Sequence, residues 1–459
     1  MGKQTQLANE IIIALGGAEN VHSITHCVTR LRIVLHDESQ VNQTRINELT
    51  VVKGSQFQSG QFQIIIGPGV QEVYAAIVLH DTQAPKAVAQ APQPTKRWYQ
   101  RLIQTLAEIL IPILPVVIAG GLVIGLQTVL TEIEFNGMSL LIAVPNLAIF
   151  SEVLTLLSQA IFMFLPVLVA FVTSKRFGGS PLLGIVVGLT LVLSQTVATT
   201  SDVWNFGFLT IPGLTYSGQV LPAIAAGLII AKTEVFLTRK IPDLFKVLLV
   251  PVFSLLFTLI VVFLIIGPIT QVLGFGLGEF LRVLFGGPWR FLTGMLFGFA
   301  YAPLTLTGFH HLFLLADLQL IAMGGTMIWP MIALSNIAQG SAALAMYVKY
   351  RQKTKRQQAG EATQAALVGG VTEPAMFGIN LPIKSAFYAA LIGSGIASGC
   401  SVVLQIQANA IGIGGLPAIL SIPVAMWSRY LGVIALAIII PFGLTLIFEA
   451  RKKENKTGE

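Results

Sequence analysis

The sequence has few charged residues and only two cysteines. Of its 459 residues, 11% are Asp, Glu, Lys or Arg, whereas a soluble globular domain carries about a quarter. The two cysteines, Cys27 and Cys400, give no disulfide framework. We find no metal-ligand spacing, Walker motif or Rossmann fingerprint. The sequence therefore gives no ground for an ATPase or nucleotide-binding role, and we expect neither a metal nor a cofactor.

The N-terminus lacks the basic region and the continuous apolar core of a cleavable signal peptide. We therefore expect the first ~80 residues to stay in the cytoplasm and to fold there, which would keep Cys27 reduced.

Apolar residues dominate the rest of the chain. They make up 54% of the sequence, and the mean hydropathy is +0.77. Many apolar runs approach the length needed to cross a bilayer, which predicts a polytopic α-helical membrane domain over residues 98–450. We expect about eight to ten membrane segments. Some are too short, or too interrupted by Gly and Pro, to cross simply, which favours re-entrant hairpins.

The net charge of +7 fits a membrane topology better than nucleic-acid binding, because the basic residues lie at the ends of apolar runs. By the positive-inside rule such clusters mark cytoplasmic loops and a cytoplasmic C-terminus. The predicted basic tail is 451–459, and the other clusters are 96–101, 175–176, 239–240 and 349–356.

Residues 1–80 predict a small cytoplasmic α/β domain, an antiparallel sheet with helices on one face. The expected helices are 6–15 and 69–79, and the expected strands are 29–35, 51–53 and 61–66. Residues 81–97 contain a stretch of Pro, Ala and Gln typical of a semi-flexible linker. The linker's length suggests that the first domain moves relative to the membrane; a passive tether is the commoner alternative.

The most informative motif is HCVTRLR at residues 26–32. Positive charge near a thiol favours the nucleophilic thiolate, so Arg30 and Arg32 would activate Cys27. If the arginines begin a strand, their side chains share one face. Two guanidinium groups beside one sulfur match the oxygens of a phosphoryl group, and Thr29 could add a hydroxyl. The alternative is a small, buried, unreactive cysteine, a packing role that we assign to Cys400.

Polar residues at membrane depth form a second group of candidates. His310 and His311 follow Gly308 and precede Asp317. Adjacent histidines point in different directions on a helix and rarely serve one metal. We interpret this histidine pair as a hydrogen-bond partner for a polar substrate; the alternative is a structural histidine between helices.

Glu373 lies in GGVTEPAMFGIN at residues 369–380. A glutamate at membrane depth between glycines and a proline predicts a broken helix or re-entrant hairpin around a cavity. A carboxylate can accept two hydrogen bonds from sugar hydroxyls, and Thr372, Asn336 and Gln339 add neutral polar groups. The alternative is that Glu373 only caps a helix.

Together these motifs resemble a known family. The segment HCVTRLR resembles the phosphocysteine loop of the enzyme IIB domain in the glucose superfamily of the phosphoenolpyruvate-dependent sugar phosphotransferase system (PTS). The strand GQFQIIIG at residues 60–67 is similar to a later strand of that domain. The segments GFHH at 308–311 and GVTEP at 370–374 resemble the sugar-binding histidine and glutamate motifs of the IIC membrane domain. The resemblance implies a sugar contact at His310, with His311 in reserve. The resemblance covers nearly the whole chain, in the order IIB, linker, IIC.

Within the superfamily the chain looks most like the trehalose-specific permeases, on the segments 317–321, 324–330, 332–341 and 411–422. Sucrose, β-glucoside and N-acetylmuramate permeases remain alternatives. The resemblance implies a phosphotransferase in a bacterial inner membrane, with both termini cytoplasmic, that acts as a homodimer. No IIA domain follows Glu459, so the resemblance implies a separate, glucose-type IIA protein as donor to Cys27, supplied by HPr and enzyme I.

Two other function classes compete with this interpretation. A proton-coupled secondary transporter could use Glu373 and His310 as a proton relay, and a sugar sensor could signal through its phosphorylation state. Neither explains the cysteine and arginines at residues 27–32.

Overall fold

The computed structural model describes residues 3–26, 30–49, 51–52, 54–58, 61–67, 69–80, 98–135, 138–198, 203–205, 210–212 and 216–457. The chain forms two compact units. Unit 1 comprises Met1–Gln100, Ala338–Ala390 and Ile439–Glu459, and unit 2 comprises Arg101–Ile337 and Leu391–Ile438.

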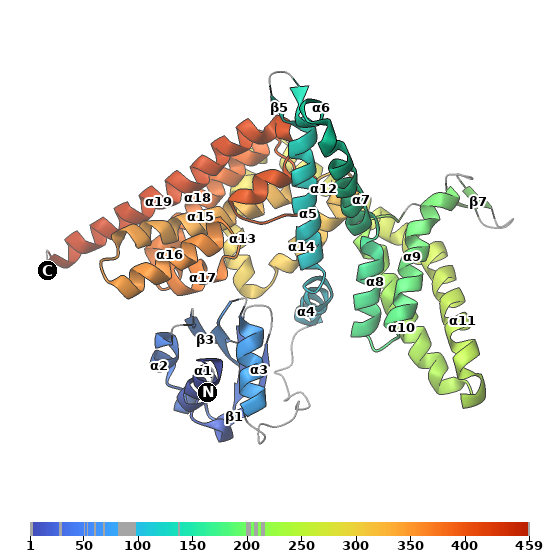
Figure 1. Ribbon diagram of the computed structural model, residues 1–459, viewed down its shortest axis with the longest axis horizontal. Coiled ribbons are helices and arrows are strands. Elements are labelled where there is room, and N and C mark those ends of the chain that lie inside the picture. The colour runs from blue at the N-terminus through green and yellow to red at the C-terminus, as the bar shows by residue number, and fades with distance from the viewer. Residues whose placement is uncertain are drawn as a thin grey trace. The chain divides into compact units, whose positions relative to one another are not determined.

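The N-terminal part of unit 1 is a four-stranded antiparallel sheet in the order β1-β2-β4-β3. Helices α1 and α3 lie side by side against it (Figure 1). Its elements are α1 (Lys3–Ala14), η1 (Ala18–Asn20), β1 (Val21–His26), β2 (Arg30–Leu35), η2 (Glu38–Gln40), α2 (Gln43–Glu48), β3 (Gly54–Gln58), β4 (Gln61–Ile65) and α3 (Val70–His80).

Alternation along β2 builds the core of this domain. Leu31 and Ile33 are fully buried and pack with Ile11 of α1 and Val73 of α3, while Arg30 and Arg32 occupy the alternate positions. Because side chains of a strand point to opposite faces in turn, the two arginines share the face away from this core. The predicted small antiparallel sheet with helices on one face is confirmed.

Two local predictions for this domain differ from the structure. The strand expected at 51–53 is wrong for its described residues, because the N–H of Val52 donates to the carbonyl of Leu49 at 2.9 Å and closes a turn. Strand β3 begins only at Gly54, and β1 and α2 were not predicted. The predicted linker, 81–97, lies outside the described residues.

The remainder of unit 1 is helical. It contains α16 (Lys353–Leu367), α17 (Glu373–Ala375), the π-helical segment η5 (Met376–Asn380), and parts of α15 (Ile328–Lys349), α18 (Lys384–Val403) and α19 (Trp427–Thr457). Its core is unusually rich in alanine, with Ala342, Ala343, Ala359, Ala362 and Ala366 all buried. Such small side chains let helix backbones approach closely, which is how helices associate in a membrane.

Unit 2 is mostly helical. Its elements are α4 (Trp98–Leu110), α5 (Leu114–Glu132), β5 (Glu134–Phe135), β6 (Met138–Ser139), α6 (Leu140–Ala143), η3 (Pro145–Leu147), α7 (Ala148–Met163), α8 (Leu165–Arg176), α9 (Pro181–Ala198), β7 (Val203–Asn205), β8 (Thr210–Pro212), α10 (Val220–Lys240), α11 (Asp243–Val261), η4 (Val262–Ile266), α12 (Gly267–Gly286), α13 (Arg290–Thr307), α14 (His310–Ala322), η6 (Leu416–Ser421) and η7 (Val424–Met426), with parts of α15, α18 and α19.

Small residues also allow the close helix contacts of unit 2. Helices α8, α9 and α10 lie side by side (Figure 1). In the crossing of α13 and α18, the hydroxyl of Ser394 donates to the carbonyl of Gly298 at 2.6 Å. Cys400 lies on α18 beside Gly399, whose added Cβ would meet the carbonyl oxygen of Phe291 at 2.9 Å. Cys400 itself is half-buried, and its packing role stays a prediction.

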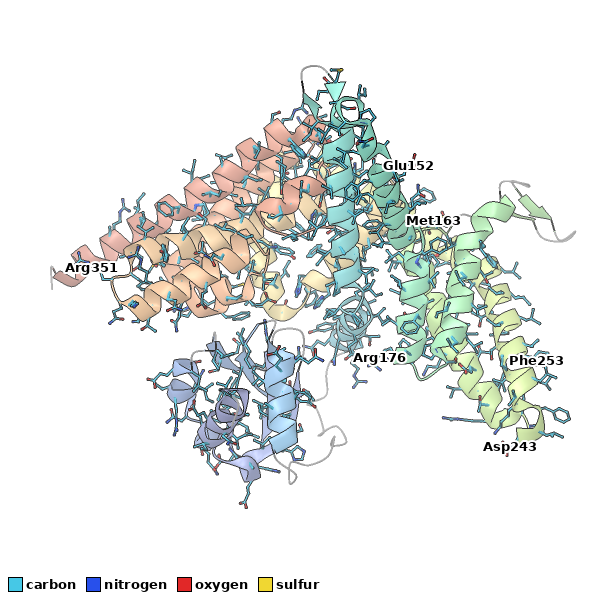
Figure 2. All side chains as sticks on the ribbon, in the orientation of Figure 1. Glu152, Met163, Arg176, Asp243, Phe253 and Arg351 are labelled. Atoms are coloured by element: carbon cyan, nitrogen blue, oxygen red, sulfur yellow. The ribbon has the colours of Figure 1, made fainter. Side chains whose placement is uncertain are left out.

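Among the described residues, seven helices are long and apolar enough to cross a membrane, or eight if the bent pair α13 and α14 counts as one span. This agrees with the lower end of the expected number. Large apolar side chains on these helices are exposed; Phe253, for example, lies on the outer side of α11 and is 50% exposed (Figure 2). Such an apolar outer surface suits lipid rather than water.

Candidate functional site

The two arginines of the cysteine motif open β2. As predicted, Arg30 and Arg32 occupy alternate positions of one strand. Arg32 pairs with Thr25 on β1 and with Gln63 on β4, so its place is fixed by strands on both sides. Cys27 and Thr29 lie outside the described residues, and their predicted roles stay predictions.

Arg30 contacts Gln63 and Phe377 within unit 1. Its Nη1 donates to Oε1 of Gln63 at 3.1 Å, and Gln63 is itself only 6% exposed. The guanidinium carbon also lies 4.7 Å from the ring centroid of Phe377, in η5. This distance is within the range of a cation–π interaction. Arg30 is therefore a well-positioned cation at the start of β2.

Glu373 lies in a broken helical segment, as predicted. Helix α16 ends at Leu367, and Gly370 has a φ of +67°, which favours glycine. Glu373 then begins α17, only three residues long, before η5. Such π-helical turns are rare in proteins overall, but those that occur often lie at functional sites. The break places Glu373 at the first position of a short helix rather than inside a long one.

The surroundings of Glu373 suit a ligand-binding carboxylate. Its side chain is half-buried, and within the described residues no hydrogen bond or ion pair to its carboxylate occurs. The alternative role as a helix cap finds no support, because Thr372 is the N-cap residue and makes no side-chain capping bond. Carboxylate oxygens accept hydrogen bonds from hydroxyl groups.

Gln339 is paired with a residue that the sequence interpretation did not single out. Nδ2 of Asn380 donates to Oε1 of Gln339 at 2.8 Å and to its backbone carbonyl at 2.9 Å. Both side chains are buried, at 1% and 0% exposure. The signal for Asn380 was present in the sequence: it is a lone amide in an apolar stretch, seven positions after Glu373.

In unit 2, the two histidines open a helix at a sharp bend. Helix α13 ends at Gly308, whose φ of +84° is left-handed, and α14 begins at His310. The two helices are bent by 119°, as expected for a re-entrant element. A glycine in this conformation is a common helix stop.

The expectation that the two histidines point in different directions is wrong. The ring centroids of His310 and His311 lie 4.0 Å apart, with an interplanar angle of 37°. The rings can approach because these residues open α14, where no preceding turn of the helix restricts their side chains.

Asp317 has a structural role, because it accepts a hydrogen bond from Thr326. The hydroxyl of Thr326 donates to its Oδ1 at 2.6 Å, and the same hydroxyl accepts from the backbone N–H of Ile328 at 3.0 Å. Both side chains are buried. Asp317 thus fixes the turn that leads into α15. That helix carries Asn336, whose side chain is 9% exposed.

Unit 2 also holds a small cavity of about 30 Å³, lined by Gln219, Gln271, Gly274, Phe275, Gln319 and Met323. Its volume suits one ordered water rather than a sugar.

The structure thus divides the predicted residues between the units. Unit 1 carries Arg30, Arg32, Gln339, Thr372 and Glu373, and unit 2 carries His310, His311 and Asn336. Among the residues that the structure describes, no group of His, Cys, Asp and Glu could hold a metal ion.

Comparison with known proteins decides the family. "Phosphotransferase system, EIIC" matches residues 107–395, and "phosphotransferase system, EIIB" matches residues 9–42. The chain belongs to the EIIBC components of the phosphotransferase system. It is therefore a membrane-embedded sugar phosphotransferase that works in a phosphoryl relay.

Several relatives match nearly the whole chain. The trehalose-specific EIIBC component of Escherichia coli (strain K12) is 39% identical over 97% of this chain and 96% of its own. That of Bacillus subtilis (strain 168) is 40% identical over 98% of this chain and 99% of its own. The sucrose-specific EIIBC component of Staphylococcus xylosus is 36% identical, over 90% of this chain and 91% of its own.

Proposed function

We propose that this EIIBC component imports trehalose and converts it to trehalose 6-phosphate during uptake. The choice of trehalose as substrate is supported by the trehalose-specific relatives, which are 39% and 40% identical over 97% and 98% of the chain. The sucrose-specific relative from S. xylosus matches at 36% over 90%. Sucrose is therefore the second candidate.

The proposed chemistry has two transfers. A thiolate at Cys27 attacks the phosphorus of a phosphohistidine on IIA, so that an S–P bond forms as an N–P bond breaks. A hydroxyl of the sugar then attacks the phosphocysteine, an O–P bond forms, and the S–P bond breaks. Arg30 and Arg32 stabilise the charge on the phosphoryl oxygens, with Thr29 as an added donor. Glu373 takes the hydroxyl proton.

Sugar recognition is assigned to polar side chains in each unit. In unit 1, Glu373 accepts hydrogen bonds from sugar hydroxyls, with Thr372 and Gln339 as further polar contacts. In unit 2, His310 is the main contact, with His311 and Asn336 in support. The exposed donor and acceptor groups of a disaccharide match such neutral and anionic side chains.

The cellular setting follows from the proposal. A separate glucose-type IIA protein donates to Cys27 and receives its phosphoryl group from phosphoenolpyruvate through enzyme I and HPr. The chain acts as a homodimer in the bacterial inner membrane, with both termini in the cytoplasm, an orientation that the basic clusters favour. Phosphate charge on the product then strongly disfavours return through an apolar path.

The deciding experiment is phosphoenolpyruvate-dependent phosphorylation of labelled sugar by membranes that contain the chain, with enzyme I, HPr and glucose-type IIA added. Trehalose and sucrose are run in parallel. We expect trehalose 6-phosphate and no sucrose phosphate. Sucrose phosphate alone would keep the mechanism and overturn the substrate, whereas proton-gradient dependence with no phosphorylated product would support a secondary transporter.

A further inference from the structure

The contact between Arg30 and Phe377 joins the two parts of unit 1. Arg30 belongs to the N-terminal sheet domain, and Phe377 belongs to η5 in the helical part. The guanidinium carbon lies 4.7 Å from the ring centroid. The ring is half-buried, so one face of a cation packs on an aromatic ring that is partly shielded from water. Partial desolvation of this kind strengthens a cation–π interaction.

Each of the two residues is close in the sequence to a residue with a proposed function. Arg30 follows Cys27 by three residues, so the chain alone keeps their Cα atoms within about 11 Å of each other. Phe377 follows Glu373 by four residues, about one helical turn. The contact therefore joins the segment that carries the proposed phosphoryl group to the segment that carries the proposed sugar-binding carboxylate.

A guanidinium group can make this contact without losing its hydrogen-bonding capacity. Its N–H donors lie in the plane of the group, while an aromatic ring packs on its face. The in-plane bond from Nη1 of Arg30 to Gln63 at 3.1 Å is present together with the contact to Phe377. Stacking on Phe377 and in-plane hydrogen bonding by the Arg30 guanidinium are therefore compatible with each other.

We propose that Phe377 is a positioning residue for phosphoryl transfer: its ring receives Arg30 and docks the IIB domain beside the Glu373 segment. The inference rests on the proposed function, since it concerns the second transfer, from phosphocysteine to sugar. Phe377 does not touch the reacting atoms. It acts by raising the fraction of time that the phosphorylated domain spends in the productive position.

The test uses the full chain in membranes and separates the two transfers. The first is measured as labelled phosphoryl incorporated from phosphoenolpyruvate into the protein, and the second as its single-turnover release to trehalose. Trehalose binding is measured separately. The variants are Phe377→Leu, which removes the π system, and Phe377→Trp, which keeps it. Tyr347→Leu is the matched control, because Arg356 lies 4.9 Å from the Tyr347 ring within the helical part of the same unit.

We expect Phe377→Leu to slow the second transfer by about two- to thirtyfold, the range of a cation–π contact. The first transfer and trehalose binding stay within about twofold of the wild type, because Phe377 lies outside the IIB domain and is not one of the proposed sugar contacts. Phe377→Trp and Tyr347→Leu keep the wild-type second transfer.

Several results would overturn the proposal. They are an unchanged second transfer in Phe377→Leu, an equal loss in Tyr347→Leu, or a loss of trehalose binding in Phe377→Leu, which would place Phe377 in the sugar site. A double-mutant cycle with Arg30→Gln adds an independent criterion. The losses in second-transfer rate from the two substitutions must be non-additive, and simple additivity would show that the two residues are not coupled. Wild-type protein that passes no phosphoryl group to trehalose would instead refute the proposed function, and the docking role with it.

Discussion

Asn380 donates from Nδ2 to both the side-chain and the backbone carbonyl of Gln339, at 2.8 and 2.9 Å. The pair connects η5, the segment that follows Glu373, to helix α15. Within the described residues, the second polar atom of each amide, Nε2 of Gln339 and Oδ1 of Asn380, is buried and makes no hydrogen bond. A buried amide pair of this kind fixes one relative position of two helical segments.

The Asn380→Ala variant tests that pair. It leaves two buried acceptors on Gln339 without their donor, which costs about 1–3 kcal/mol. We expect a lower thermal midpoint for the purified protein and weaker trehalose binding. The matched control is Gln357→Ala, which removes an exposed amide that bonds to Glu361 at 3.2 Å on α16. An equal shift in both variants would contradict the buried pair's role.

The Cys27→Ser variant addresses the proposed nucleophile. A serine hydroxyl is far less nucleophilic than a thiolate, so labelled phosphoryl incorporation and sugar phosphorylation are both expected to be abolished. Trehalose binding stays within about twofold, because the binding residues are elsewhere. Cys400→Ser is the control, since Cys400 lies on α18 among small residues. Phosphorylation that persists in Cys27→Ser would rule out the phosphocysteine.

Asn20 is expected to be the main polar support of the IIB domain. Its Nδ2 donates to the carbonyls of Leu15 at 2.7 Å and Asp37 at 2.9 Å, and its Oδ1 accepts from the N–H of Asp37 at 2.8 Å. Asn20→Ala removes three hydrogen bonds at a buried site and should destabilise the domain by about 2–3 kcal/mol.

The readout for Asn20→Ala is amide hydrogen exchange of β2 and β4 in the full chain, which should become faster. Asn42→Ala provides the comparison. It removes a single exposed capping bond to the N–H of Arg45, at 3.0 Å, which is worth about 1 kcal/mol. Exchange that is faster in Asn42→Ala than in Asn20→Ala would reverse the predicted order.

The elements that the sequence predicted are those with a strong local pattern. The alternation at Arg30–Leu35 and the long apolar runs are such patterns, because each indicates a strand or a helix without reference to distant residues. Strand β1 was not predicted, because its pattern is mixed and it is defined by pairing with β2. The turn at Val52 was mistaken for a strand because a short apolar run does not show whether it pairs.

The candidate site also combines features that a local sequence pattern predicts with features that depend on distant residues. The break at Glu373 could be inferred, because glycine and proline mark it in the sequence. The pairing of Gln339 with Asn380, and the contact of Arg30 with Phe377, join residues 41 and 347 positions apart. No local pattern contains such pairs, since they arise only when helices and strands pack.

Gly298 is predicted to be intolerant of even a methyl group. A Cβ added there would lie 2.5 Å from the carbonyl oxygen of Ser394 on α18. Gly298→Ala should therefore push the two helices apart, at a cost of about 1–3 kcal/mol, seen as a lower thermal midpoint. Gly276→Ala, on α12, is the control because an added Cβ meets nothing within 4 Å. Equal midpoints for the two variants would argue against close packing at Gly298.

Glu373→Gln separates charge from shape at the proposed sugar contact. The amide keeps one acceptor but loses the negative charge, and hydrogen bonds to charged groups are worth about 1.5–3 kcal/mol. We therefore expect trehalose binding to weaken by about 10- to 100-fold. The second transfer should slow as well, since an amide cannot take the hydroxyl proton, while labelling of the protein from phosphoenolpyruvate is retained. Glu361→Gln, an exposed carboxylate on α16, should leave all three measurements unchanged. Wild-type binding and transfer in Glu373→Gln would remove Glu373 from the site.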